Sequence, residues 1–181
     1  IKELRRLAAE KNVVAIGETG LDYVRTPETR QAQTELFQEH VSLARDRGLL
    51  LNMHCRQAAT DMVDILRRIG HPKPKGALHG FEGKASELTE WLDLGFCISI
   101  GPRAFTRANP IDFREAVKHI PHDRLLIETD SSPRSVSTGE SLGPASAVLV
   151  AEKLAALYNS TAEEIGNIAT ANLKRLLADS R

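Results

Sequence analysis

The sequence has few cysteines and aromatic side chains, no excess charge of either sign and no long apolar run. Its two cysteines, Cys55 and Cys97, lie inside apolar runs, which is typical of buried, reduced thiols and predicts a cytoplasmic protein. Because 24 basic residues balance 24 acidic ones, no overall field attracts the chain to nucleic acid or an anionic membrane. No run reaches the roughly 20 apolar residues of a membrane span, so we expect no membrane partner.

The sequence contains enough apolar residues to form one hydrophobic core. Hydrophobic residues make up 41% of 181 positions, which predicts a single domain over residues 1–181. Five short apolar runs stand out. They are nearly continuous rather than alternating, as in strands covered on both faces. The predicted strands are residues 13–17, 49–54, 76–81, 96–101 and 124–129.

Helical patterns separate these runs. In the segment from Pro27 to Gly48, an apolar stripe of Leu36, Phe37, Val41 and Ala44 predicts a helix that ends at the glycine. In the last helix, which we expect to begin with a capping box of Ser160 and Glu163, Asn172 interrupts the stripe and is expected to bond buried backbone. Another helix is expected to open with Asn109 as its cap and Pro110 in its first turn.

Alternating strands and helices predict an α/β fold with a parallel sheet. A TIM-type (β/α) barrel is favoured over an open, doubly wound sheet, because polar residues gather at one end of the runs. The first run ends at Glu18, the second ends at His54, the third carries His79 and the fifth delivers Glu128 and Asp130. The fourth run offers no ligand.

In a parallel β/α fold these ends meet at one rim, where active sites form. A glutamate, two histidines and an aspartate are ligands suited to a divalent metal, so Glu18, His54, His79 and Asp130 together predict a metal-dependent hydrolase. On this interpretation Gly17 and Gly20, on either side of Glu18, let backbone and substrate come close.

Each residue taken alone has a plainer interpretation. Glu18 could simply terminate a strand, Asp130 could form an Asx turn, and either histidine could be a satisfied structural group. The remaining histidines are expected to be structural or exposed; they are His40, His71, His119 and His122.

Two further residues lie beside the predicted ligands and have open assignments. Asp22 could hydrogen-bond a metal ligand or cap its own turn. Arg56 could clamp a phosphate or make an ordinary surface ion pair.

The segments VVAIGETGLDY, MHCRQA, LHGFEG, IPHDRLLIETDSSP and TANLKRLL resemble, in order and spacing, the TatD family of metal-dependent deoxyribonucleases. The resemblance implies a TIM-type barrel and phosphodiester hydrolysis assisted by Mg²⁺, Mn²⁺ or Zn²⁺, with two ions in the complete protein. It also implies that Glu18 bridges two metals, that His54 and His79 are ligands, and that Asp130 ligates metal and accepts a proton from water.

The sequence departs from the family pattern in identifiable places. Family members open with a strand that carries a His-x-His pair, and no such pair occurs here. The five predicted β/α units correspond to the last five of eight, so a longer protein, a partner or self-association is expected to complete the barrel. Gly80 replaces a family cysteine, and the Ser-rich loop after Asp130 lacks an aromatic residue but offers Arg134 to a phosphate.

The predicted activity is hydrolysis of DNA by a metal-activated water. DNA ends or single strands are the expected substrates, because a chain of zero net charge is expected to bind long duplex DNA only weakly. Arg56 and Arg134 are the expected contacts to substrate, and Asp130 and Glu18 the catalytic residues. Two alternatives stay open. One is a related hydrolase acting on an ester, amide or aminoacyl-tRNA bond; the other is a catalytically silent, truncated barrel that acts as a binding module.

Overall fold

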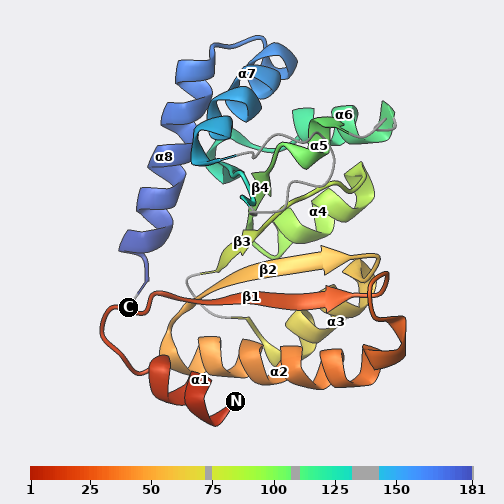
Figure 1. Cartoon of the computed structure of the whole chain (residues 1–181), viewed down its shortest axis with the longest axis vertical. Helices are drawn as coiled ribbons and strands as arrows, with labels where there is room; N and C mark the ends of the chain where they lie inside the picture. The colour runs from red at the N-terminus through yellow and green to blue at the C-terminus, as the bar shows by residue number, and fades with distance from the viewer. Residues whose placement is uncertain (72–74, 107–110, 132–142, 181) are drawn as a thin grey trace. The chain divides into compact units, whose positions relative to one another are not determined.

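Each predicted apolar run overlaps one strand, although the first two strands extend beyond the predicted ends of their runs. The computed structural model describes residues 1–71, 75–106, 111–131 and 143–180. Its strands are β1 (Ala15–Asp22), β2 (Leu50–Arg56), β3 (Gly76–Leu78), β4 (Cys97–Ile100) and β5 (Leu125–Ile127). They follow one another in the order β1-β2-β3-β4-β5, and the pairs β1–β2, β2–β3 and β4–β5 are parallel. The predicted α/β fold with a parallel sheet is therefore confirmed (Figure 1).

Helices connect these strands. They are α1 (Lys2–Leu7), α2 (Arg30–Arg47), α3 (Ala59–Ile69), α4 (Ala85–Asp93), α5 (Arg103–Thr106), α6 (Ile111–Lys118), α7 (Ala147–Tyr158) and α8 (Ala162–Ala178). Short 3₁₀ turns occupy Pro27–Thr29, His122–Arg124 and Pro144–Ser146. Asn109 and Pro110, which were predicted to begin a helix, lie outside the described residues.

The chain packs as two compact units. The first comprises Ile1–Leu78, Glu90–Cys97 and Lys174–Arg181, and the second comprises His79–Thr89 and Ile98–Leu173. The single domain over residues 1–181 stays a prediction. Glu18 and His54 thus belong to the first unit, and His79 and Asp130 to the second.

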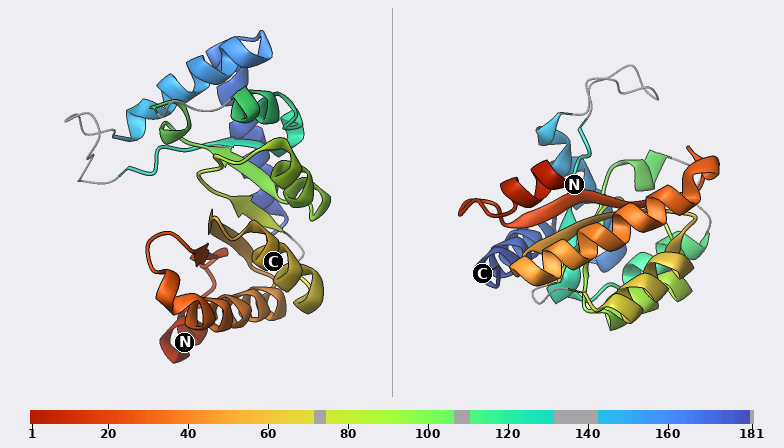
Figure 2. Two further views of the ribbon diagram at one scale, coloured as in Figure 1. Left: turned by 90° about the vertical axis from the view of Figure 1, so that its right-hand side faces the viewer. Right: turned by 90° about the horizontal axis from the view of Figure 1, so that it is seen from below.

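In the first unit α2 and α3 cover one face of the β1–β2 pair (Figure 2). The side chains of Phe37, Val41 and Ala44 on α2 are buried, as the stripe predicts, but Leu36 is 49% exposed. The predicted burial of Leu36 was wrong: Leu43, seven residues later on the same side of the helix, is buried, whereas Leu36 near the start of the helix is not. The helix ends at Gly48, whose φ of 66° is the left-handed conformation expected of a glycine cap.

In the second unit α7 packs against α6 and near β5. The rings of Phe81 and Phe113 lie 6.4 Å apart at their centroids, and the Tyr158 hydroxyl donates to the carbonyl of Val117 at 2.6 Å. Asn172 is buried and its amide donates to the carbonyls of His122 and Leu125, at 2.7 and 2.8 Å. The predicted supporting role of Asn172 is therefore confirmed.

The cap of α8 differs by one residue from the prediction. Thr161 and Glu164 form the reciprocal pair: the Glu164 amide donates to Thr161 Oγ1 at 3.2 Å, and the Thr161 amide donates to the Glu164 carboxylate at 2.9 Å. Ser160 adds its hydroxyl to the same carboxylate at 2.6 Å. The expected partner Glu163 was wrong because the helix begins at Ala162, one position later than the sequence suggested.

Candidate functional site

Glu18 lies inside β1 and does not end it, which corrects the sequence-based expectation. The strand continues for four more residues to Asp22, and its pairing with β2 shifts register between Ile16 and Thr19. Glu18 therefore sits at an irregularity in the ladder, where its side chain is 52% exposed. A glutamate within a strand interior is an unusual choice unless its carboxylate has a task at the surface.

The glycines beside Glu18 are required by the neighbouring strand. A Cβ on Gly17 would lie 2.7 Å from the Cβ of Asn52 on β2. Gly20 has φ of +150°, and a Cβ there would overlap the carbonyl oxygen of His54. The backbones of β1 and β2 can thus approach closely enough to bring Glu18 beside His54. The approach of substrate to these glycines stays a prediction.

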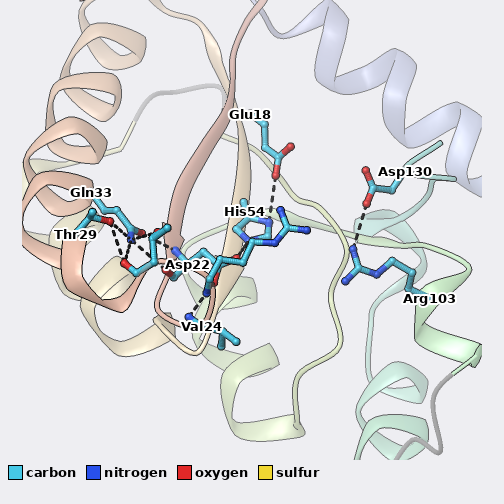
Figure 3. A network of polar contacts seen from close by, with 10 residues as sticks. Glu18, Asp22, Val24, Thr29, Gln33, His54, Arg103 and Asp130 are labelled. Atoms are coloured by element: carbon cyan, nitrogen blue, oxygen red, sulfur yellow. Dashed lines mark hydrogen bonds and ion pairs between the residues drawn. The ribbon is translucent and has the colours of Figure 1, made fainter. Parts of the chain in front are cut away.

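His54, on β2, lies between two carboxylates of the first unit (Figure 3). Its Nδ1 is 3.1 Å from Glu18 Oε1, and its Nε2 is 3.4 Å from Asp22 Oδ2. An imidazole nitrogen and a carboxylate oxygen are both donors that a divalent ion accepts. Glu18 and His54 therefore have the donor chemistry that would hold such an ion.

Asp22 caps its own turn and also contacts His54, whose role as a metal ligand stays a prediction. Its Oδ1 accepts hydrogen bonds from the amides of Val24 and Arg25, at 2.9 and 2.8 Å, and so caps the turn after β1. Its Oδ2 faces His54. Burial raises the pKa of Asp22, but the hydrogen bonds from Arg25, Val24 and His54 outweigh it, so its pKa lies below the ordinary value.

Gln33 on α2 is a supporting residue that the sequence analysis missed. Its Oε1 accepts from the Asp22 amide at 2.7 Å, and its Nε2 donates to the Asp22 carbonyl at 3.1 Å (Figure 3). The same amide nitrogen lies 3.0 Å from both the Thr26 carbonyl and Thr29 Oγ1. Gln33 thus fixes the backbone of the loop that carries Asp22. A polar residue one turn into a helix gives no signal of this role in sequence.

His79 and Glu128 form a second histidine–carboxylate pair, in the second unit. His79 follows β3 directly and Glu128 follows β5 directly. Nδ1 of His79 is 3.3 Å from Glu128 Oε1, and the side chains are 13% and 18% exposed. The amide of Glu128 donates to the Ile100 carbonyl at 3.0 Å, which extends the β4–β5 pairing by one residue.

Asp130 pairs with Arg103, the first residue of α5, which the sequence analysis also missed. Oδ2 of Asp130 lies 3.5 Å from Nη1 of Arg103, and both side chains are about half exposed (Figure 3). Asp130 has a φ of 45°, a conformation that Asp tolerates better than most residues. Arg103 lies two residues after the fourth apolar run, and as an arginine it has no metal-ligating character that would single it out in the sequence.

The two predicted substrate contacts have different outcomes. Arg56 ends β2, and its carbonyl accepts the amide of Tyr23 at 3.0 Å. Whether the Arg56 guanidinium contacts a substrate phosphate or forms a surface ion pair stays open, and the phosphate contact stays a prediction. Arg134 lies outside the described residues.

Three histidines outside the predicted ligand set have structural contacts, as expected. His40 Nδ1 is 2.7 Å from Thr19 Oγ1, and burial lowers the pKa of His40. His71 Nδ1 is 2.8 Å from Lys75 Nζ, and the ring of His122 packs edge-on against Tyr158 at 5.3 Å.

These features define a class of protein: a parallel α/β protein with carboxylate and imidazole donors within the strands or just beyond their carboxyl ends, as in metal-dependent hydrolases. Comparison with known proteins gives the family. The family described as TatD related DNase matches residues 1–178, so the chain belongs to this family of metal-dependent hydrolases.

Individual relatives agree with the family assignment. The chain is 40% identical over 178 residues to the uncharacterized metal-dependent hydrolase YcfH of Escherichia coli K12, covering 97% of this chain and 67% of that protein. It is 32% identical over 179 residues to the 3′-5′ ssDNA/RNA exonuclease TatD of Musicola paradisiaca, covering 96% and 68%. The crystal structure of YJJV, a TatD homolog from Escherichia coli K12, superposes with a TM-score of 0.86 at 27% identity, covering 97% of this chain and 68% of that one.

The chain spans about two thirds of the length of these relatives. Within the described residues, no helix is long and apolar enough to cross a membrane.

Proposed function

We propose that the protein hydrolyses phosphodiester bonds of nucleic acid, with DNA ends or single strands as substrate. The match of residues 1–178 to the TatD related DNase family carries this proposal. The 32% identity to a protein named 3′-5′ ssDNA/RNA exonuclease supports nucleic acid as the substrate class. The balance of 24 basic and 24 acidic residues favours a substrate held at a few phosphates over long duplex held at many.

We assign the metal ligands to Glu18, His54, His79 and Asp130. Glu18 and His54 in the first unit and His79 in the second each offer a donor atom of a type that binds divalent ions. The mixture of oxygen and nitrogen donors suits Mg²⁺, Mn²⁺ or Zn²⁺, and the family resemblance supports two ions in the complete protein. A bound divalent ion supplies Lewis acidity and lowers the pKa of a coordinated water toward about 7.

The chain's own side chains supply the remaining steps. Asp130 is the proposed acceptor of the proton from the attacking water, and its ion pair with Arg103 holds the carboxylate in place. Glu18 is the proposed bridging carboxylate. Arg56 and Arg134 contact substrate phosphates, for which a guanidinium is well suited because it binds two oxygens at once.

The five β/α units are proposed to form part of a (β/α)₈ barrel. The TM-score of 0.86 to a longer TatD homolog supports this proposal. A barrel leaves no open strand edge, whereas β1 is the first strand in the sheet order described here. We therefore propose that further strands, from a longer chain or a second protein, pair with β1.

Cleavage of an end-labelled single-stranded oligonucleotide tests the proposed activity. We expect cleavage with Mn²⁺ or Mg²⁺, loss of it with EDTA, and loss of at least about a hundredfold in rate in Asp130→Asn, because general-base catalysis contributes roughly 10²- to 10⁴-fold. Glu115→Gln, which alters an exposed carboxylate that forms an ion pair with Lys118 on the same helix, is the matched control and retains full activity.

Three results would replace this proposal. Turnover of ester or amide substrates without nuclease activity would indicate a related hydrolase of another specificity. Aminoacyl-tRNA cleavage would do the same. Absence of bound metal at saturating Mn²⁺ or Zn²⁺ would indicate a silent module that binds a partner.

A further inference from the structure

Glu128 is a partly buried carboxylate for which the proposed reaction has no task. It follows β5 by one residue and is 18% exposed, whereas Asp130, two positions later, is 45% exposed. Its Oε1 lies 3.3 Å from Nδ1 of His79, whose side chain is 13% exposed. A carboxylate that is this well covered is stabilised only by specific partners.

We propose that Glu128 is a positioning residue that fixes the tautomer and orientation of His79, an inference that rests on the proposed role of His79 as a metal ligand. A neutral imidazole has one N–H and one lone pair. When Nδ1–H donates to Glu128, the lone pair lies on Nε2, which becomes the ligand atom. Carboxylates perform this service for many metal-binding histidines.

The backbone around Glu128 is built to hold the carboxylate at this point. The amide of Glu128 donates to the carbonyl of Ile100 at 3.0 Å, which anchors the residue to β4. A Cβ on Gly101 would lie 3.3 Å from both Cγ and Oε1 of Glu128, and a Cβ on Gly80 would lie 3.6 Å from Oε1. Glycine at position 101 therefore leaves the room that the carboxylate occupies.

Gly80 also lies beside the carboxylate of Glu128. A Cβ at this position would be in contact with Oε1 of Glu128, at 3.6 Å, whereas glycine leaves this space open. Gly80 also has φ of +58°, a conformation that glycine adopts without strain. The carboxylate of Glu128 is thus left to interact with His79.

Nuclear magnetic resonance of the ring nitrogens tests the tautomer directly in metal-free protein. At about pH 9, well above the ordinary imidazole pKa of about 6.5, we expect His79 to be protonated on Nδ1. In Glu128→Ala the population shifts to the Nε2–H form, which a free histidine side chain favours in water. A His79→Asn spectrum assigns the signals. An Nε2–H form in the wild type, or an unchanged tautomer in Glu128→Ala, would overturn the proposal.

A second variant keeps the test informative if Glu128→Ala fails to fold. Gly101→Ala retains every charge but forces the Glu128 side chain to move by a few tenths of an ångström. We expect an intermediate tautomer ratio, with Glu115→Ala as a control that leaves the ratio unchanged. The wild-type ratio in folded Gly101→Ala would contradict the close packing that we infer.

Metal titration separates this inference from the proposed function. We expect Glu128→Ala to bind Mn²⁺ or Zn²⁺ about 10- to 100-fold more weakly, as outer partners of metal ligands do. If His79 carries its proton on Nδ1 but the wild-type protein binds no metal, the positioning role of Glu128 is supported and the proposed metal centre is refuted. Loss of metal without a change of tautomer would make Glu128 a ligand in its own right and overturn the positioning role.

Discussion

The two histidine–carboxylate pairs have the same chemistry but different support. In the first unit His54 lies on a strand between two carboxylates and is 30% exposed, and its partner Glu18 is 52% exposed. In the second unit His79 lies after a strand, its side chain is 13% exposed, and Glu128 beside it is 18% exposed. The first pair is held by the close approach of β1 and β2 at Gly17 and Gly20 and by the hydrogen bonds around Asp22, and the second by partial burial and contacts at Gly101. The exposed carboxylate of Glu18 is accessible to a metal ion from solvent. The more covered carboxylate of Glu128 is better suited to orienting the imidazole ring of His79.

Substituting a glycine near each histidine should have the largest effect on stability and should separate the two regions. In Gly20→Ala the new methyl overlaps the His54 carbonyl, so we expect the free energy of unfolding to fall by about 3 kcal/mol or more. In Gly80→Ala the methyl has ordinary contacts and only the positive φ is unfavourable, which costs about 1 to 2 kcal/mol. Urea denaturation measures both, and equal losses would contradict the different packing.

Removing the Asp22 carboxylate should weaken metal binding by the first pair. Asp22→Ala deprives His54 of its Nε2 partner, and we expect an affinity about 10- to 100-fold lower in calorimetric titration with Mn²⁺ or Zn²⁺. Asp22→Asn keeps a side-chain oxygen that can accept from the Val24 and Arg25 amides but removes the charge that faces His54. Comparing the two variants therefore separates loss of the turn cap from loss of the carboxylate beside His54. Wild-type affinity in Asp22→Ala would show that the first pair needs no orienting carboxylate.

Gln33→Ala should affect the first unit alone. The variant loses the paired bonds to the Asp22 backbone, each worth about 0.5 to 1.5 kcal/mol, so we expect a loss of about 1 to 3 kcal/mol in stability. Amide exchange should quicken in the loop after β1 and stay unchanged at Glu128. Gln31→Ala, on the exposed surface of the same helix, is the matched control. Equal protection in both variants would refute the role of Gln33.

The smallest expected effect is a pH dependence from His40. Because burial lowers its pKa in the folded protein, the unfolded chain binds a proton at a higher pH. The contribution of neutral His40 to stability is complete above the unfolded value of about 6.5 and is lost as pH falls toward the lowered pKa. His40→Gln should flatten the stability curve in that window, as measured by urea denaturation across pH. An unchanged slope would show that another group titrates there.

The sequence predicts the existence and order of the strands because each strand is a short apolar run bounded by turn residues. It does not predict where β1 ends. Glu18 looks like a terminator, but pairing with β2 carries the strand on to Asp22, and one strand's pattern contains no information about its neighbour's register. The apolar stripe of α2 likewise does not show how far along the helix other elements cover it, and Leu43 is buried whereas Leu36, on the same side, is exposed.

The candidate site divides in a similar way. His54, His79 and Asp130 could be singled out because ligand-type residues recur at the ends of apolar runs. Gln33 and Arg103 could not, because their roles depend on groups distant in sequence: the Asp22 backbone and the Asp130 carboxylate. A long polar side chain on a helix is ordinary, and only the fold shows what it contacts.

Metal binding at equilibrium tests the central claim most directly. Dialysis against Mn²⁺ or Zn²⁺ followed by elemental mass spectrometry should find bound metal in the wild type. His54→Asn and His79→Asn should each weaken binding by more than the roughly 10- to 100-fold that an outer partner contributes, while His40→Asn has no effect. Unchanged metal content in His54→Asn and His79→Asn would contradict the assignment of these residues to a metal centre.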